Sequence, residues 1–246
     1  PFSLSYQVIK PEKSNKSSKK IQVRSMFNSI AHRYDYINGI MTFNMDKYWR
    51  REVCNMVLEN NPESIIDIAT GTGDIAFDLI QENNKVVGID NAEQMLEIAN
   101  QKKTSDNISF QLEDAENMSF ENDSFSAATV SFGVRNFEDL SIGLTEIKRI
   151  LAPGGKLVIL ETAVPSFFIL RFGYFLYTKM IIPLIGKIIA QNKNAYKYLS
   201  DSAQHFPHGK EFKLILERIG FENIEIKYLS LGIVNIYYAE KPKQLF

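Results

Sequence analysis

The sequence predicts an α/β fold: an open, mostly parallel, seven-stranded sheet with helices on both faces. Short apolar runs alternate with helical patterns through the middle of the chain, and two further apolar runs stand close together near its end. A glycine-rich stretch, DIATGTGD at residues 67–74, follows the first run. Such a turn between a strand and a helix is typical of nucleotide-binding sheets. At 246 residues and 45% hydrophobic content, the chain is long enough for one such domain with additions.

Seven segments have the length and apolar character of strands: residues 64–70, 85–90, 108–114, 125–132, 156–162, 223–230 and 233–241. Helical patterns near 73–82, 92–103 and 138–151 separate the first five strands, which predicts parallel pairing among them. Pro153-Gly154-Gly155 makes the turn into the fifth strand. After a helix near 209–219, only Leu231 and Gly232 join the last two strands, so these must form an antiparallel hairpin.

Composition divides the chain into a mobile basic tail, an N-terminal helical cover, a binding domain and a helical lid inserted in that domain. These parts are residues 1–20, 21–60, 61–246 and 164–205, respectively. The cover is predicted as several short helices, interrupted at Asn38-Gly39 and around residues 42–44. Charges and a proline break the apolar lid, so it lacks the roughly 18 apolar residues of a membrane-spanning helix. Amphipathic helices are expected there.

The overall charge argues against a nucleic-acid partner, because 28 basic and 29 acidic residues leave a net charge of -1. A single cysteine, Cys54, excludes an internal disulfide and is expected to be buried. The polar first twenty residues do not resemble a secretion signal. These features favour a cytoplasmic protein.

Acidic residues lie at the ends of the predicted strands, where an α/β sheet binds its ligand. Asp67 is in the first strand, Asp74 follows the glycine loop, and Asp90 and Asp114 end the next two strands. Asp74 would repel a pyrophosphate, because two unit charges about 4 Å apart interact by roughly 4 kcal/mol at an effective dielectric of 20. S-adenosylmethionine carries a sulfonium and an ammonium in place of phosphate, and it fits an acidic loop better.

Two of these acidic residues have an expected partner group on this cofactor. Asp90 is placed to accept both ribose hydroxyls, and Asp114 to accept the adenine amino group. Gly71 and Gly73 let the backbone approach the methionine portion closely. A dinucleotide-binding oxidoreductase remains the alternative, which failure to bind NADH would exclude.

Three longer segments carry a family resemblance: YDYINGIMTFNMDKYW at 34–49, SFGVRNF at 131–137 and RILAPGGKLVILETA at 149–163. With these, the chain resembles Rossmann-like class I S-adenosylmethionine-dependent methyltransferases and, among them, the ubiquinone/menaquinone biosynthesis C-methyltransferase family, from about Val23 to the C-terminus. It departs from the family pattern at Ile37, Thr42, Asp46, Ile150, Ala152 and Ala163. Asp46 replaces a histidine, which exchanges a titratable base for an anion, so no catalytic role is assigned there. The resemblance implies cofactor contacts at Thr72, Asp90, Asp114, Ala115 and Ser131.

The resemblance also implies C-methylation of a reduced polyprenyl quinone precursor, either demethylmenaquinol or the methoxy-benzoquinol precursor of ubiquinone. Arg135 follows the fourth strand and is expected to stabilise the developing phenolate, the alternative being a surface ion pair with Glu138 or Asp139. Asn136 is expected to orient a ring oxygen, and Tyr34 to bond the quinol or a bridging water.

Other assignments stay open at this stage. Asp35 is expected to orient Arg135 or Tyr34, or to cap a helix, and Trp49 to pack in the core. No metal is required, because no ligand spacing is convincing. The lid is expected to cover a polyprenyl tail and to contact the inner face of the membrane, and a homodimer is left open. Two other functions compete with this one. The first is a methyltransferase for another lipid or small acceptor, and the second is a non-catalytic scaffold, for which Asp46 is the best support.

Overall fold

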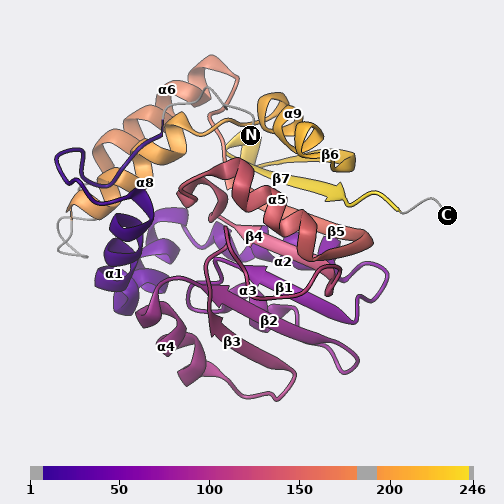
Figure 1. Ribbon diagram of the computed structural model, residues 1–246. Helices are drawn as coiled ribbons and strands as arrows, with labels where there is room; N and C mark the ends of the chain where they lie inside the picture. Colours follow the sequence, from indigo (N-terminus) through magenta and orange to yellow (C-terminus); the bar gives the residue numbers. More distant parts are fainter. Residues whose placement is uncertain (1–7, 182–192, 244–246) are drawn as a thin grey trace.

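The computed structural model describes residues 8–181 and 193–243 (Figure 1). Its centre is a seven-stranded sheet in the order β3 (Ile108–Leu112), β2 (Lys85–Asp90), β1 (Ser64–Ile68), β4 (Phe125–Ser131), β5 (Leu151–Thr162), β7 (Val234–Glu240) and β6 (Glu222–Leu229). The first five strands pair in parallel, and β7 is antiparallel to both of its neighbours. The predicted sheet and hairpin are confirmed.

Helices cover both faces of the sheet, as Figure 1 shows. On one face, α5 (Leu140–Ile150) and α9 (Lys210–Ile219) bury their apolar residues against alternate positions of β1, β4 and β5. On the other face, α2 (Met45–Leu58) and the short α3 (Asp74–Asp78) pack against the intervening positions. Alternation of side chains along each strand supplies both cores, because successive residues point to opposite faces. Trp49 and Cys54 are buried in the second core, as predicted.

The N-terminal cover differs from the prediction. Residues 19–42 form one helix, α1 (Lys19–Thr42), in place of several short ones. The expected break at Asn38-Gly39 is wrong, since one glycine in a helix costs only about 1 kcal/mol and does not end it. The break before α2 is confirmed, because Phe43 and Asn44 both have left-handed backbones, with φ of 53° and 58°.

The basic tail is also shorter than predicted, since α1 begins at Lys19 with Ser18 as its N-cap. The Lys19 side chain is only 1% exposed, and its ammonium donates to the carbonyl oxygens of Arg135 and Phe137 at 2.8 and 2.7 Å. Burial lowers the pKa of Lys19 to about 8. The aliphatic stem of a lysine tolerates burial when its ammonium finds acceptors, which composition does not reveal. Residues 1–7 lie outside the described part of the chain.

The segment predicted as a lid contains α6 (Phe168–Leu176), the π-helical turn η2 (Tyr177–Ile181) and α8 (Lys193–His205). Helix α8 packs on α1, which in turn packs on α4 (Glu93–Lys102), and all three helices contribute to a third apolar core. The predicted lid also includes residues 182–192, which lie outside the described residues. Among the helices that are described, none is long and apolar enough to cross a membrane.

Candidate functional site

A pocket lies at the carboxyl ends of β1, β2 and β4 and encloses about 690 Å³, part of it open to solvent. Helix α1 closes one side of it with Tyr34. The pocket brings together seven of the residues selected from the sequence: Tyr34, Gly71, Asp90, Asp114, Ala115, Ser131 and Asn136. Four others do not line it: Asp67, Thr72, Gly73 and Arg135.

The two loop glycines have different roles. Gly71 has φ of +57°, and a Cβ there would meet no atom within 4 Å, so its backbone faces open space at the pocket. Gly73 has φ of +85°, but its Cβ would lie only 2.8 Å from the ring of Phe110. Gly71 therefore allows close ligand approach, whereas Gly73 is required by the packing beneath the loop.

Two non-glycine residues at the pocket also have left-handed backbones. Ala69 follows β1 and Phe132 follows β4, and both have φ of 56°. Such conformations cost of order 1–3 kcal/mol each and cluster at functional sites. Neither residue type signals a positive φ, so the sequence does not reveal these two conformations.

Asp90 holds the two loops that form the floor of the pocket. Its carboxylate accepts the Gly71 N–H at 2.8 Å and the Ala92 N–H at 2.9 Å. Burial raises the pKa of Asp90, although these two N–H groups oppose the shift. Each carboxylate oxygen has a second lone pair, so Asp90 keeps acceptor capacity for ribose hydroxyls.

Asp114 also faces the pocket, with a partner that the sequence analysis missed. The Lys20 ammonium lies 2.5 Å from Asp114 Oδ2 and 3.4 Å from a carboxylate oxygen of Glu116. Lys20 is itself a pocket residue. The first turn of α1 therefore crosses the side of the pocket where an adenine amino group would meet Asp114.

Ser131, at the end of β4, presents a buried hydroxyl to the pocket. Its Oγ has no hydrogen-bond partner among the described residues. Buried polar groups are normally paired, and an unpaired one in a pocket is a point of attachment for a polar ligand. The backbone of Ala115 lies in the same pocket, as the resemblance implied. Ser131, Asp90 and Asp114 thus fit the amino, hydroxyl and ammonium groups of S-adenosylmethionine.

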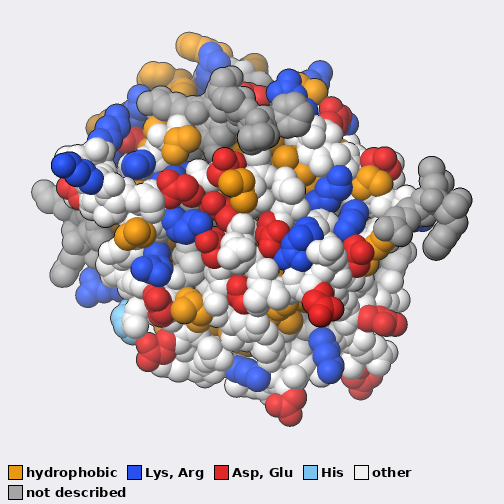
Figure 2. Space-filling model, in the orientation of Figure 1, with side chains coloured by type: hydrophobic (Ala, Val, Ile, Leu, Met, Phe, Trp, Pro, Cys, Tyr) orange, Lys and Arg blue, Asp and Glu red, His pale blue; other side chains and the backbone are white. Residues whose placement is uncertain are grey.

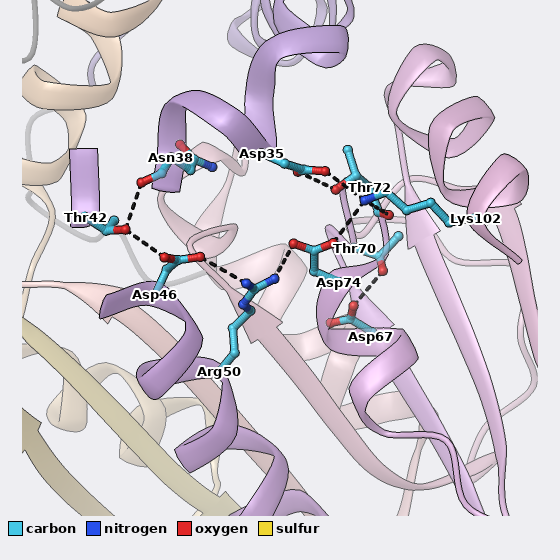
Figure 3. A network of polar contacts seen from close by, with 10 residues as sticks. All are labelled: Asp35, Asn38, Thr42, Asp46, Arg50, Asp67, Thr70, Thr72, Asp74 and Lys102. Atoms are coloured by element: carbon cyan, nitrogen blue, oxygen red, sulfur yellow. Dashed lines mark hydrogen bonds and ion pairs between the residues drawn. The ribbon is translucent and has the colours of Figure 1, made fainter. Parts of the chain in front are cut away.

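Asp67 supports the loop from below. Its side chain is 2% exposed, and the Thr70 hydroxyl donates to Asp67 Oδ2 at 2.5 Å (Figure 3). Burial raises the pKa of Asp67 to about 7. Asp67 therefore acts on any ligand only through the loop above it.

The raised pKa of Asp67 predicts a pH-dependent stability. The folded protein binds the Asp67 proton more tightly than the unfolded chain does. Protonation of Asp67 therefore adds to the free energy of unfolding, in full below about pH 4, and this added stability is lost as the pH rises through about 7. Asp67→Asn cannot titrate, so it should not lose stability over this range. The free energy of unfolding of the variant minus that of wild type should therefore be larger at pH 8 than at pH 5. Denaturant unfolding at both pH values measures the difference. If the stability difference between variant and wild type is the same at pH 5 and pH 8, the raised pKa of Asp67 is contradicted.

Thr72 lies outside the pocket and is hydrogen-bonded to a network of charged side chains (Figure 3). Its hydroxyl donates to Asp35 at 2.6 Å, and Lys102 donates to the other Asp35 oxygen at 2.7 Å. Asp35 therefore ties α1 to the glycine loop. The hydrogen-bond partners of Asp35 are Thr72 and Lys102, in place of the Arg135 or Tyr34 expected from the sequence, and Asp35 lies inside α1 and does not cap it.

The network continues to α2 through Asp74. Lys102 lies 3.0 Å from Asp74 Oδ1, and Arg50 pairs with both Asp74 and Asp46 (Figure 3). Asp46 also accepts the Thr42 hydroxyl at 2.8 Å. Asp74 is thus paired with two cations and does not present a free charge to a ligand, so the argument that it repels a pyrophosphate is wrong.

Removing one cation of the network is expected to weaken cofactor binding modestly. Lys102 is 34% exposed, and exposed ion pairs contribute about 0.2–1 kcal/mol each. Lys102→Met should therefore raise the Kd for S-adenosylmethionine by about threefold, and 1 M salt should shrink that difference. Calorimetric titration measures it. Lys227→Met, which removes the Lys227–Glu52 pair elsewhere on the surface, should leave the Kd unchanged. An equal effect of both substitutions would contradict a role for the network.

Arg135 lies next to the pocket, in the turn η1 (Val134–Asn136). Its side chain is 8% exposed and forms an ion pair of 2.5 Å with the buried Glu161. The alternative of a surface pair is wrong, because Glu138 accepts backbone N–H groups of α1 and Asp139 caps α5. No local signal in the sequence indicates Glu161 as the partner, because it lies 26 residues away.

The other two selected polar residues connect the pocket to its helical cover. Asn136 Oδ1 accepts the hydroxyl of Tyr198, on the lid helix α8, at 3.0 Å. Tyr34 packs edge-on against Phe27, with ring centroids 5.9 Å apart, and burial raises its pKa. Tyr34 therefore keeps its proton at neutral pH. In the part of the chain that the structure covers, no group of His, Cys, Asp and Glu residues is arranged to hold a metal ion.

This sheet, with a cofactor pocket at the loop after β1, is that of a class I S-adenosylmethionine-dependent methyltransferase. A solved S-adenosylmethionine-dependent methyltransferase from Thermotoga maritima, described as a possible histamine N-methyltransferase, matches with a TM-score of 0.63 at 18% identity over 89% of this chain and 99% of that one. The [4+2]-cyclase SpnF matches with a TM-score of 0.65 at 15% identity, over 92% and 97% of the two chains.

The chain belongs to the ubiE/COQ5 methyltransferase family, whose model matches residues 13–241. The demethylmenaquinone methyltransferase of Bacteroides fragilis is 39% identical over 95% of this chain and 97% of that protein. The ubiquinone/menaquinone biosynthesis C-methyltransferase UbiE of Geotalea daltonii is 37% identical over 89% and 96%. Family and pocket together identify S-adenosylmethionine as the cofactor.

Proposed function

We propose that this enzyme transfers a methyl group from S-adenosylmethionine to a ring carbon of a reduced polyprenyl quinone precursor. Demethylmenaquinol is the favoured acceptor, and the methoxy-benzoquinol precursor of ubiquinone is the second. The observation that carries the proposal is the buried Arg135–Glu161 pair beside a pocket suited to S-adenosylmethionine. The names of the full-length relatives support the same chemistry.

Five pocket residues would hold the cofactor directly. Asp90 would accept the ribose hydroxyls, Asp114 the adenine amino group, and Ser131 would bond through its unpaired hydroxyl, with the backbones of Gly71 and Ala115 beside them. Residues 67, 72 and 73 would act through the shape of the loop. When bound, the cofactor supplies a methyl group on a positively charged sulfur, so the departing thioether is neutral.

The chain must make the acceptor carbon nucleophilic and align it with the methyl group. A quinol ring gains electron density as its hydroxyl loses a proton, and the buried guanidinium of Arg135 would stabilise the resulting negative charge. Asn136 and Tyr34, which line the pocket, would orient the ring oxygens. Positioning supplies much of the rate in such a transfer, because little acid or base work is needed on the donor.

The test is turnover of methyl-labelled S-adenosylmethionine with chemically reduced demethylmenaquinol, reduced demethylated benzoquinol and a non-quinol lipid acceptor, each in detergent micelles. Label in one or both quinols would support the proposal and define its range. Label in the lipid alone, or tight cofactor binding with no transfer, would overturn the quinol assignment. Binding of NADH in place of S-adenosylmethionine would favour the oxidoreductase alternative.

We further propose that α6 contacts the membrane in which a polyprenyl tail resides. Its apolar side chains are exposed: Phe167, Phe168, Ile169, Phe172 and Leu176 are 50–69% accessible. Hydrophobic side chains protrude at the upper edge of Figure 2, where Figure 1 places α6. Elsewhere on that face, charges of both signs alternate. An apolar helix face with adjacent cations at Arg171 and Lys179 suits an anionic bilayer surface.

Vesicle cosedimentation tests this contact. The double variant Phe168→Asp/Phe172→Asp should lose binding to anionic phospholipid vesicles, whereas Leu214→Asp, at an exposed position on α9, should retain it. If the double variant instead binds vesicles normally and dissociates a dimer in sedimentation experiments, the face is a homodimer interface and the membrane proposal fails.

A further inference from the structure

Glu161 is a buried carboxylate that the proposed function has so far used only as the partner of Arg135. It lies near the end of β5 and is 1% exposed. Its Oε1 atom accepts hydrogen bonds from Arg135 at 2.5 Å and from the Thr162 N–H at 2.7 Å. Its Oε2 atom is buried and has no hydrogen-bond partner among the described residues. One oxygen is therefore fixed, and the other keeps its full capacity as an acceptor.

Two further unpaired polar atoms lie with this oxygen. Arg135 Nε and Asn235 Oδ1 are also buried without a hydrogen-bond partner in the described part of the chain. Asn235 is the register partner of Glu161 in the antiparallel β5–β7 pair, so their side chains share one face of the sheet. The three residues present one donor and two acceptors. Buried polar groups are normally satisfied, so this set calls for a polar ligand group.

The set lies between the pocket and the lid. The Arg135 guanidinium lies 5.9 Å from the ring centre of Phe132, which lines the pocket, and the next residue, Asn136, also lines it. On the lid side, Tyr174 is 8% exposed, and its burial raises its pKa to about 12, so its hydroxyl stays neutral. The set therefore adjoins the lining of the pocket through Phe132 and Asn136.

We propose that Glu161 is the proton acceptor of the reaction. Its Oε2 atom takes the proton of the quinol hydroxyl, while Arg135 Nε donates a hydrogen bond to the quinol oxygen that loses this proton. A single hydroxyl, which accepts one hydrogen bond and donates one, satisfies both atoms. The inference rests on the proposed function, since it requires a quinol acceptor. It assigns the base that the sequence left unidentified.

The step is balanced without an oxidant or reductant. The O–H bond breaks, its proton moves to Glu161, and the electron pair stays on the ring system. The ring carbon forms the new C–CH3 bond as the S–CH3 bond breaks, and that electron pair leaves on sulfur. The ring carbon then releases its hydrogen as a proton, and the oxygen regains a proton from Glu161. The net products are the methylated quinol, a neutral thioether and one proton.

The alternative role of Glu161 is that of a counter-ion for Arg135 only. If Glu161 is the base, conditions that ionise the acceptor should restore the activity of a Glu161 variant; if it is only a counter-ion, they should not. Glu161→Gln removes the base and keeps the shape. We expect kcat with demethylmenaquinol at neutral pH to fall by about 10²–10⁴, the usual range for a lost general base, with the Kd for S-adenosylmethionine unchanged. The activity should recover as the pH approaches about 10, where a phenol ionises unaided. Glu161→Asp should retain part of the rate.

An acidic acceptor separates the roles directly. A demethylnaphthoquinol analogue, halogenated on its unreactive ring so that its hydroxyl ionises below the assay pH, needs no base. The ratio of variant to wild-type kcat should rise toward unity with this analogue. An equally low ratio with both acceptors, or a Glu161→Gln variant within twofold of wild type, would overturn the inference.

The wild-type control separates failure of the proposed function from failure of the base assignment. If wild type transfers no label to any quinol, the proposed function fails and not the base assignment. If Glu161→Gln does not fold, Glu161→Asp decides: its kcat relative to wild type should be closer to unity with the ionised analogue than with demethylmenaquinol. The same ratio with both acceptors would again overturn the assignment.

Discussion

Replacing Arg135 with methionine is expected to lower kcat by about 10²–10³, because it removes the charge that would stabilise the developing phenolate. The same substitution leaves Glu161, which is 1% exposed, as an unpaired buried carboxylate. Breaking a buried ion pair in this way costs about 3–5 kcal/mol of unfolding free energy.

Single-turnover kinetics and urea unfolding measure the two effects separately. Arg135→Lys is the matched control: it keeps the charge but loses the Nε donor, which has no partner among the described residues and which the proposed step uses. It should recover more of the stability than of the rate. If Arg135→Met folds with wild-type stability and turns over normally, the buried pair has neither role.

Asp90→Ala is expected to weaken S-adenosylmethionine binding by about 100-fold, or ~2.7 kcal/mol. The substitution removes the proposed ribose acceptor and also the two hydrogen bonds that hold Gly71 and Ala92. Hydrogen bonds to a charged group contribute roughly 1.5–3 kcal/mol each, so a loss of this size is reasonable even if the loop relaxes partly.

Isothermal titration with S-adenosylmethionine measures the effect on affinity. Asp90→Asn keeps one carbonyl acceptor and should lose less affinity than the alanine variant. Asp106→Ala, in the turn before β3 and outside the pocket, should bind as wild type does. A Kd for Asp90→Ala within threefold of wild type would contradict the proposed ribose contact.

The arrangement of the sheet was predictable because local signals determine it. Parallel strands need crossover helices, and the apolar runs between Ser64 and Thr162 alternate with helical patterns. The predicted two-residue link, Leu231-Gly232, allowed only an antiparallel hairpin, and in the structure the turn Ser230–Gly232 lies there. Such signals lie within a few residues of the element that they define, so they can be read without tertiary contacts.

The pocket residues were predictable for a related reason. Residues at the ends of parallel strands meet at one edge of the sheet, so Asp90, Asp114 and Ser131 lie in one pocket although they are far apart in sequence. Their contacts with the cofactor remain proposals. Strand position alone fixes which residues face the ligand, but it does not fix which atoms bond to it.

The pairing of charges was not predictable, because each pair joins elements far apart in the chain. Arg135 pairs with Glu161, 26 residues away, and not with the nearby acidic residues. Lys20 reaches Asp114 over 94 residues. In the same way, Asp74 meets two cations only after α2 and α4 have packed around the loop. A carboxylate that looks free in the sequence is neutralised by the fold.

The most direct test of a C-methylating quinol enzyme is the position of the transferred methyl group. Wild-type protein would be incubated for a single turnover with methyl-deuterated S-adenosylmethionine and reduced demethylmenaquinol in micelles, and the product analysed by mass spectrometry and NMR. We expect the deuterated methyl group on a ring carbon, with both quinol oxygens unmodified. A methyl ether, or an unchanged quinol despite bound cofactor, would contradict the account.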